Sequence, residues 1–490
     1  MVITLLIVYG LLLSFILLFS LVQLQLTVAY RRKRKQAAEV APLLPDNVPF
    51  VTVQLPIYNE RYVTQRLIDS VCAINWPRAR FEVQVLDDST DETIAIAADK
   101  VREWRSKGTD IVHVRRSERT GYKAGALANG LSIAKGELLA VFDSDFVPGS
   151  DFLERTVPWF ADEQLGLVQT RWGHLNSDSN LLTRLQAFGL DAHFTIEQTG
   201  RSTLGHFINF NGTGGVWRKQ CVADAGGWRP DTLTEDLDLS YRAQLNGWRF
   251  KYLEDVVSPA ELPSQMNALK TQQHRWNKGA AECVRLNLPK VFRKPGLSAG
   301  TKLHAAMHLM NSTIFIAIVL IALLSVPLLW VKSRHPELRV LFNIAVVFSF
   351  SLLVLAVCYW TARRAKYKGL RGFIAFAGMF PVFLSVSMGL ALHNAVAVIE
   401  GYLGIKSSFV RTPKLALRSG DAGLRKDSYM KSAITPVTLL EGLFFLYFLF
   451  ALWLGWKLDD GGLWFFHGML ALGFGSVFYY SVVHSWRTAG

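Results

Sequence analysis

Long apolar stretches flank a middle segment that has the pattern of a soluble domain. Residues 2–30 carry no charge and are long enough to cross a bilayer of roughly 30 Å. Further apolar stretches follow the middle segment, at 303–331, 340–362, 373–399, 433–456 and 461–485. A chain of this kind cannot bury all its apolar residues in one soluble core, so we expect a soluble domain held by membrane helices.

The distribution of basic residues predicts which side of the membrane this domain occupies. A basic cluster, Arg31 to Lys35, directly follows the first apolar stretch, which is too long for a signal peptide and predicts a signal anchor over 1–30. The positive-inside rule then places the next domain in the cytoplasm. The basic loop 406–432 should also be cytoplasmic, which leaves 373–399, interrupted by Pro381, as a broken or in-plane element. We therefore expect a multi-pass membrane protein with five crossings and a C-terminal hairpin over 433–490.

Charge and cysteine content narrow the possible partners. The chain of 490 residues has 53 Lys and Arg against 39 Asp and Glu, a net charge of +14. Because the basic residues gather where apolar stretches end, they indicate contact with the lipid bilayer and not nucleic-acid binding. The four cysteines have neither CxxC nor Cys/His spacing, which predicts reduced, packed thiols. They are Cys72, Cys221, Cys283 and Cys358.

In the middle segment, short apolar runs alternate with helical patterns. The runs predict strands over 51–56, 82–86, 110–114 and 138–142, with helices over 63–74 and 91–106 between them. This alternation predicts an α/β fold with a mostly parallel, doubly wound sheet. Ligands of such sheets bind at the carboxyl ends of the strands. Two acidic motifs, Asp87-Asp88 and Asp143-Ser144-Asp145, stand at predicted strand ends.

Four motifs in order carry a resemblance to a known family. They are Asp87-Asp88, Asp143-Ser144-Asp145, Thr234-Glu235-Asp236 and the QxxRW block Gln272 to Trp276. This order resembles that of membrane-embedded, inverting family-two glycosyltransferases such as cellulose, hyaluronan and chitin synthases. The QxxRW block is most similar to that of plant mannan synthases and differs from ceramide glucosyltransferases. The resemblance implies a GT-A-type catalytic domain with a doubly wound mixed sheet over 31–277 and flanking transmembrane helices.

A nucleotide sugar carries a diphosphate whose charge must be neutralised as it leaves. Two carboxylates one residue apart can share a hard divalent ion that bridges the phosphates. We expect Asp145 to be the main ligand of Mg²⁺ or Mn²⁺, and the resemblance implies that Asp143 helps to hold the metal or the donor. A solvated turn is the alternative interpretation of the bare triplet. Lys123, between Gly121 and Gly125 at a predicted helix start, is the expected cation for the diphosphate, or else a solvated lysine.

The nucleotide itself requires further contacts. The resemblance implies that Asp88 accepts a hydrogen bond from the nucleobase and that Asp87 lies near the ribose. A helix cap before Asp91 is the alternative. Tyr58 and Glu60, in the turn after the first strand, should line the same pocket.

Inverting transfer needs one base to take the proton of the acceptor hydroxyl. The resemblance assigns this role to Asp236, whereas a helix cap at Thr234 is the structural alternative. Residues Phe210 to Gly215 match the FxGT-type loop beneath donor and acceptor, which implicates Gly212 and Thr213.

Gln272, Arg275 and Trp276 of the QxxRW block should close the site. Arg275 can pair with the departing pyrophosphate, since its fork of donors suits phosphate better than a lysine does. Trp276 can stack on the acceptor sugar, with an interfacial anchor as the alternative. Residues Phe409 to Lys414 resemble the FxVTxK gating loop of cellulose synthases, although Arg411 and Pro413 interrupt the match.

The remaining segments complete the expected organisation. Residues 278–302 mix apolar and basic side chains, which predicts an interfacial helix, or else a short surface helix. Membrane-embedded helices should fill 303–405.

Three functions are consistent with these observations. The first is transfer of a hexose from a UDP- or GDP-sugar, by family analogy UDP-glucose, to a β-linked glycan. The second is synthesis of a glycolipid by one transfer to a lipid acceptor. The third, an inactive scaffold or transporter, is disfavoured by the intact carboxylates. The sequence leaves auxiliary subunits open.

Overall fold

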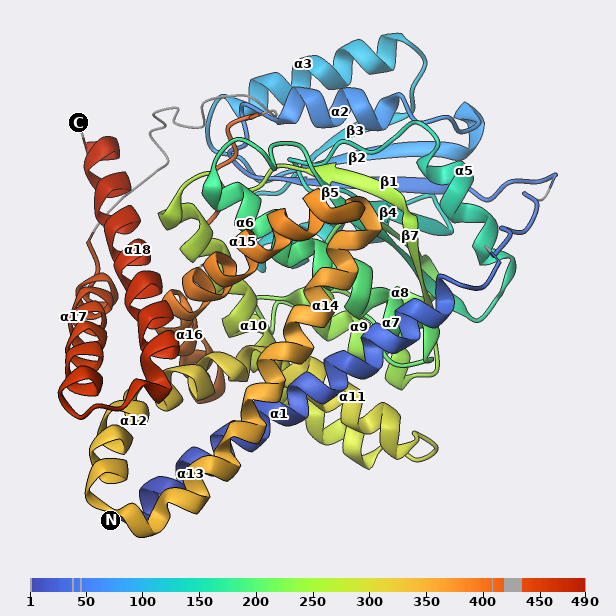
Figure 1. Ribbon diagram of the computed structural model, residues 1–490. Coiled ribbons are helices and arrows are strands. Elements are labelled where there is room, and N and C mark those ends of the chain that lie inside the picture. Colours follow the sequence, from blue (N-terminus) through green and yellow to red (C-terminus); the bar gives the residue numbers. More distant parts are fainter. Residues whose placement is uncertain (1, 38, 45, 408, 418–433, 490) are drawn as a thin grey trace.

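The computed structural model describes residues 2–37, 39–44, 46–407, 409–417 and 434–489. An α/β domain forms one side of the molecule, and long helices from both ends of the chain pack beside it (Figure 1). Helix α1 (Val2–Lys33) lies alongside α14 (Phe350–Lys366), although more than 300 residues separate them in the sequence.

Seven strands form one mixed sheet in the order β3-β2-β1-β4-β6-β5-β7. The strands β1 to β4 are mutually parallel, β6 runs antiparallel to both β4 and β5, and β5 is parallel to β7. This arrangement confirms the mixed, doubly wound sheet that the sequence predicted. The strands are β1 (Val51–Ile57), β2 (Phe81–Asp87), β3 (Ile111–Arg115), β4 (Leu138–Val141), β5 (Leu165–His174), β6 (Gly215–Arg218) and β7 (Arg249–Ala260).

Both faces of the sheet are buried, which explains the unbroken apolar runs of its parallel strands. On β4, Leu138 and Ala140 point into one core, whereas Leu139 and Val141 point into the other. Helices α2 (Thr64–Cys72) and α3 (Thr93–Ser106) cover the first face, and α4 (Tyr122–Ile133), α8 (Lys219–Asp224) and α9 (Glu235–Leu245) cover the second. The remaining helices of the domain are α5 (Phe152–Thr156), α6 (Leu181–Ala192) and α7 (Thr199–Thr203).

The segment expected to form a separate interfacial helix differs in the structure. Helix α10 (Met266–Arg293) is one continuous helix of 28 residues that carries the QxxRW block and runs on to Arg293. A new helix, α11 (Ala299–Leu309), begins after Ser298, whose side chain accepts a hydrogen bond from the Thr301 N–H. The prediction of one helix over 278–302 was therefore wrong at both ends.

Six helices of the described chain are long and apolar enough to cross a membrane, judged by length and composition. The α-helices after α11, besides α14, are α12 (Ile314–Arg334), α13 (Arg339–Ala345), α15 (Gly369–Gly389), α16 (Ala391–Leu403), α17 (Pro436–Lys457) and α18 (Trp464–Ala489). The six candidate spans are Val2–Lys33, Ala299–Arg334, Pro336–Lys366, Gly369–Gly389, Pro436–Lys457 and Gly461–Ser485.

The stretch 373–399 is divided between two helices, α15 and α16, which meet at Leu390. The interruption is not at Pro381, which lies inside α15. Of these two helices, only α15 is long and apolar enough to be a candidate span. The number of membrane crossings stays a prediction.

Candidate active site

A pocket of about 190 Å³ opens at the carboxyl ends of β1, β2 and β4, as expected for a sheet of this topology. Helix α10 and the segment after α16 complete its walls. The predicted site residues that line it are Tyr58, Glu60, Asp88, Lys123, Asp143, Asp145, Gly212, Asp236, Gln272, Arg275 and Trp276.

Asp87 and Thr213 do not line the pocket but support residues that do. The Asp87 carboxylate is fully buried, 2.8 Å from His113 Nε2, and accepts a hydrogen bond from the Ser89 N–H at 2.9 Å. Thr213 is also fully buried, and its hydroxyl accepts a hydrogen bond from the Asp143 N–H at 2.9 Å. Both residues fix the backbone on which Asp88 and Asp143 are carried.

Lys123 connects the acidic residues on the pocket floor. Its Nζ lies 2.5 Å from Asp143 Oδ1, donates to the Gly212 carbonyl at 2.8 Å, and lies 3.9 Å from Glu235 Oε1. Lys123 stands in the first turn of α4, where free N–H groups also favour an anion. The lysine is therefore held inside the pocket and is not a solvated surface residue.

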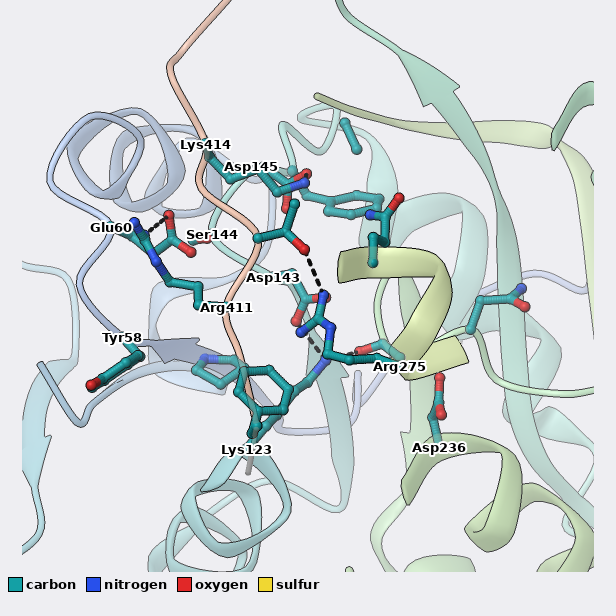
Figure 2. A pocket seen from close by; sticks show the side chains of 18 of the residues that line it. Tyr58, Glu60, Lys123, Asp143, Ser144, Asp145, Asp236, Arg275, Arg411 and Lys414 are labelled. Carbon is teal, nitrogen blue, oxygen red and sulfur yellow. Dashed lines mark hydrogen bonds and ion pairs between the residues drawn. The ribbon is translucent and has the colours of Figure 1, made fainter. Parts of the chain in front are cut away.

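A short segment after α16, residues 409–417, crosses the pocket and is called the strap here. Two of its cations pair with carboxylates of the pocket, as Figure 2 shows. Lys414 Nζ lies 2.6 Å from Asp145 Oδ2 and 3.1 Å from the Glu261 carbonyl. Arg411 Nη1 lies 2.7 Å from Glu60 Oε2. Burial raises the pKa of Glu60 to about 8, against the opposing effect of Arg411.

The strap also contacts the QxxRW block. The Phe409 ring stacks on Tyr122 with centroids 5.6 Å apart, and the Arg275 guanidinium carbon lies 4.6 Å from the Phe409 centroid. Arg275 Nη2 donates to the Thr412 hydroxyl at 3.0 Å. The described part of the predicted gating loop thus covers the pocket, and Arg411, which interrupts the motif, makes one of its ion pairs. Residues 408 and 418–432 of that predicted loop lie outside the described residues.

Asp236 stands in the first turn of α9, beside Lys123 and Gly212. A side-chain carbon added to Gly212 would lie 3.0 Å from Asp236 Oδ2 and 3.3 Å from Lys123 Nζ, at a backbone φ of +80°. Burial, reinforced by the charge of Glu235, raises the pKa of Asp236 to about 7. Thr234 occupies the N-cap position, but its side chain makes no capping hydrogen bond.

Trp276 belongs to an aromatic wall of the pocket. Its ring centroid lies 6.4 Å from that of Trp172, which in turn contacts Phe146 at 5.3 Å. Both tryptophans line the cavity, so a flat apolar surface faces the site. Such a surface is suited to an apolar face of a sugar ring.

The carboxylate oxygens of Asp145 and Asp143 are ligands of the kind that a hard divalent cation prefers. Its carboxylate already holds a positive group, the Lys414 ammonium, and Asp143 lines the same cavity. Within the described ranges, no group of three or more His, Cys, Asp and Glu side chains is arranged to hold a metal ion. A cation here would therefore need further oxygens, from water or from a bound ligand, to complete its shell.

Several pocket residues were missed by the sequence reasoning. Glu261 follows β7 directly, and its carboxylate accepts a hydrogen bond from the strap's Leu415 N–H at 2.9 Å. The rule that placed the other acidic residues at strand ends could have identified it. Arg119 and Trp172 also line the cavity, but no motif marks them.

The chain is similar in sequence to known glycosyltransferases. Residues 49–279 match the family described as "Glycosyltransferase like family 2". The chain is 45% identical over 261 residues to "Glucomannan 4-beta-mannosyltransferase 1" of Oryza sativa subsp. japonica, covering 52% of this chain and 50% of the relative. It is 44% identical over 261 residues to "Probable glucomannan 4-beta-mannosyltransferase 4" of the same plant, covering 52% and 48%. The chain thus spans about half the length of the curated relatives it matches.

Two solved structures match parts of the chain with low TM-scores. The mannosyltransferase PcManGT from Pyrobaculum calidifontis, in complex with GDP-Man and Mn²⁺, has a TM-score of 0.49 and 20% identity, covering 81% of this chain and all of that one. S. aureus TarS has a TM-score of 0.36 and 16% identity, covering 72% and 54%. Residues 49–279 thus match a family-two glycosyltransferase domain, and 261 residues of the chain are homologous to the glucomannan 4-beta-mannosyltransferases.

Proposed function

We propose that the protein transfers a hexosyl group, with inversion, from a nucleotide sugar to a β-linked glycan. The observation that carries this proposal is the placement of Asp236, Lys123 and Asp145 in one pocket lined by Trp276. The names of the relatives favour mannose as the transferred sugar over the glucose expected from family analogy.

Asp236 would act as the general base. It removes the proton of the acceptor hydroxyl while that oxygen bonds to the anomeric carbon and the bond to the diphosphate breaks. The electron pair of the broken bond leaves on the diphosphate. With a pKa of about 7, Asp236 is both substantially ionised and basic enough for this step at neutral pH.

The leaving diphosphate needs positive charge on the side opposite the acceptor. Lys123 and Arg275 line the cavity and supply it. A Mg²⁺ or Mn²⁺ ion held by Asp145 and Asp143 would add a Lewis acid for the same charge. Lys414 pairs with the Asp145 carboxylate, so its ammonium would compete with that ion.

The acceptor would approach from the aromatic wall. Trp276 and Trp172 can stack on a sugar ring and orient its hydroxyl towards Asp236. The apolar helices would anchor the enzyme in the bilayer, with the catalytic domain on the cytoplasmic side as the basic flanks indicate.

The test is a donor profile with the purified full-length chain in detergent and Mn²⁺. Labelled GDP-mannose, GDP-glucose, UDP-glucose, UDP-galactose and UDP-N-acetylglucosamine are incubated separately with an oligomannan acceptor, and product size is read on a gel. We expect a ladder of β-linked products with a mannosyl donor. A single-sugar lipid product would instead support the glycolipid synthase, and lack of turnover with every donor would refute transferase function.

A further inference from the structure

Arg119 lines the same pocket but takes part in none of the contacts described so far. It lies in the connection between β3 and α4, with its guanidinium carbon 3.4 Å from the Tyr58 ring centroid and 4.9 Å from that of Tyr122. Phe409 of the strap lies further away, at 5.8 Å. Arg119 is thus surrounded by the faces of aromatic rings, not by carboxylates.

Its hydrogen-bonding capacity is unused. Arg119 Nε is buried and has no hydrogen-bond partner among the described residues. A buried donor without an acceptor is unfavourable, and a ligand atom that accepts from it would remove that cost. Since Arg119 lines the cavity, an acceptor of a bound donor molecule is within its reach.

The neighbouring arginine of the same connection is used differently. Arg116 Nε donates to Asp88 Oδ1 at 3.0 Å and Arg116 Nη2 to Asp88 Oδ2 at 2.5 Å. Arg116 thereby fixes the Asp88 carboxylate on the pocket wall and leaves it as an acceptor facing the cavity. This part of the pocket therefore presents one oriented acceptor, Asp88, which follows β2, and one unused donor, Arg119 Nε, in the connection between β3 and α4.

This end of the pocket does not resemble a phosphate site. The cations suited to phosphate, Lys123 and Arg275, lie with Asp143 and the strap. The Tyr58 ring already covers one face of the Arg119 guanidinium, with the guanidinium carbon 3.4 Å from the ring centroid, so the N–H edge of Arg119 and not that face is left for a bound heterocycle. We propose that Arg119 reads the nucleobase of the donor: its N–H groups donate, in the guanidinium plane, to acceptors on the edge of the base, while Tyr58 holds the guanidinium in place. The proposal rests on the function above in that the ligand is a nucleotide.

The geometry of a guanidinium makes the proposal selective. Guanine carries two neighbouring acceptors, O6 and N7, which an arginine fork can bind together. The two carbonyls of uracil are separated by an N–H, so a fork can reach only one of them. A lysine keeps the charge but loses the fork. Replacing Arg119 by Lys should therefore weaken the binding of a guanine nucleotide more than the binding of a uracil nucleotide.

The experiment measures binding and not turnover. GDP, UDP and inorganic pyrophosphate are titrated by calorimetry, each with Mn²⁺, into the detergent-purified full chain and its Arg119→Met and Arg119→Lys variants. Arg78→Met is the matched control, because Arg78 also lies over an aromatic ring, Phe81, 5.9 Å away and outside the pocket lining. Thermal unfolding of each variant checks that it is folded. If Arg119→Met does not fold, the binding of the nucleotides is compared with Arg119→Lys alone.

We expect Arg119→Met to weaken the better-bound nucleotide about tenfold or more, the equivalent of one lost bidentate contact, while pyrophosphate binding changes less than twofold. Arg78→Met should change neither. An equal loss for pyrophosphate would overturn the proposal in favour of a phosphate role, and unchanged nucleotide binding would reduce Arg119 to a packing residue. If the base-dependent loss is found but no sugar is transferred, the proposed function fails and the nucleobase site stands.

Discussion

The floor and the cover of the pocket are built in different ways. The floor consists of strand ends and the first turns of α4 and α9, and its groups are held by the sheet and by short local contacts such as the Thr213 hydroxyl on the Asp143 N–H. The cover is the strap, which comes from more than 250 residues beyond Asp145 and is joined to the floor by the pairs Lys414–Asp145 and Arg411–Glu60. A cation bound at Asp145 would compete with Lys414 for that carboxylate. We therefore expect the floor to keep its arrangement and the strap to shift when a cation binds at Asp145.

The largest effect should come from breaking the floor at its base. Asp236→Asn should lower transfer by roughly two to four orders of magnitude, because no base remains to take the acceptor proton. Nucleotide affinity should change little, since Asp88, Lys123 and Asp145 stay in place. Turnover and calorimetric binding are measured in the same preparation, with Asp99→Asn, an exposed position on α3 outside the pocket lining, as the control. Near-normal transfer by Asp236→Asn would rule out this base.

Removing the carboxylate shared by floor and cover should have the next largest effect. Asp145→Asn should lower Mn²⁺-dependent turnover by about two orders of magnitude, the scale of several kcal/mol of lost charge stabilisation. The measurement is turnover across a Mn²⁺ titration, with thermal unfolding to show that the variant is folded. Full activity at saturating Mn²⁺ would contradict the assignment of Asp145 as a metal ligand.

The pH dependence tests the electrostatics of the floor. The active base is the Asp236 carboxylate, and its pKa is raised to about 7, so activity should rise with pH through about 7. Well below that value kcat/KM should fall about tenfold per pH unit, because the ionised fraction of Asp236 falls about tenfold with each unit. Glu235→Gln should move the rise to lower pH, since it removes a negative charge that raises the Asp236 pKa. A profile that is flat between pH 5.5 and 8 would show that another group limits the rate.

The smallest effect should come from loosening the cover. Lys414→Gln removes the ammonium that pairs with Asp145, so the Mn²⁺ concentration for half-maximal binding should fall several-fold. Tryptophan fluorescence can follow binding without turnover, since Trp172 and Trp276 line the pocket. Lys457→Gln, at the end of α17, is a control remote from the pocket lining. An unchanged or weaker affinity would mean that Lys414 does not compete with the cation.

Much of the floor could be predicted because its signals are local. Apolar runs and the acidic residues that end them gave β1, β2 and β4 within a residue or two of their observed bounds. The sequence reasoning was less successful on α10, where Lys278 appeared as part of a basic, interfacial pattern. In the structure Lys278 is fully buried, with its Nζ 2.7 Å from the Ser407 hydroxyl and 3.5 Å from Glu400 Oε2. A charged residue is buried only with partners, and these partners lie more than 120 residues away.

The amino-acid sequence by itself determined the class of domain, the alternation of strands and helices, and the chemistry available at the strand ends. These depend on residues near one another in the chain, such as Asp143 directly after β4. Only the tertiary structure decided that Arg411 and Lys414 reach Glu60 and Asp145, and that Asp87 is a buried support while Asp88 faces the pocket. Such contacts depend on how distant segments pack and on which of two adjacent side chains points inward. The local sequence does not contain this information. It shows that adjacent side chains point to opposite sides, but not which of the two sides faces the pocket.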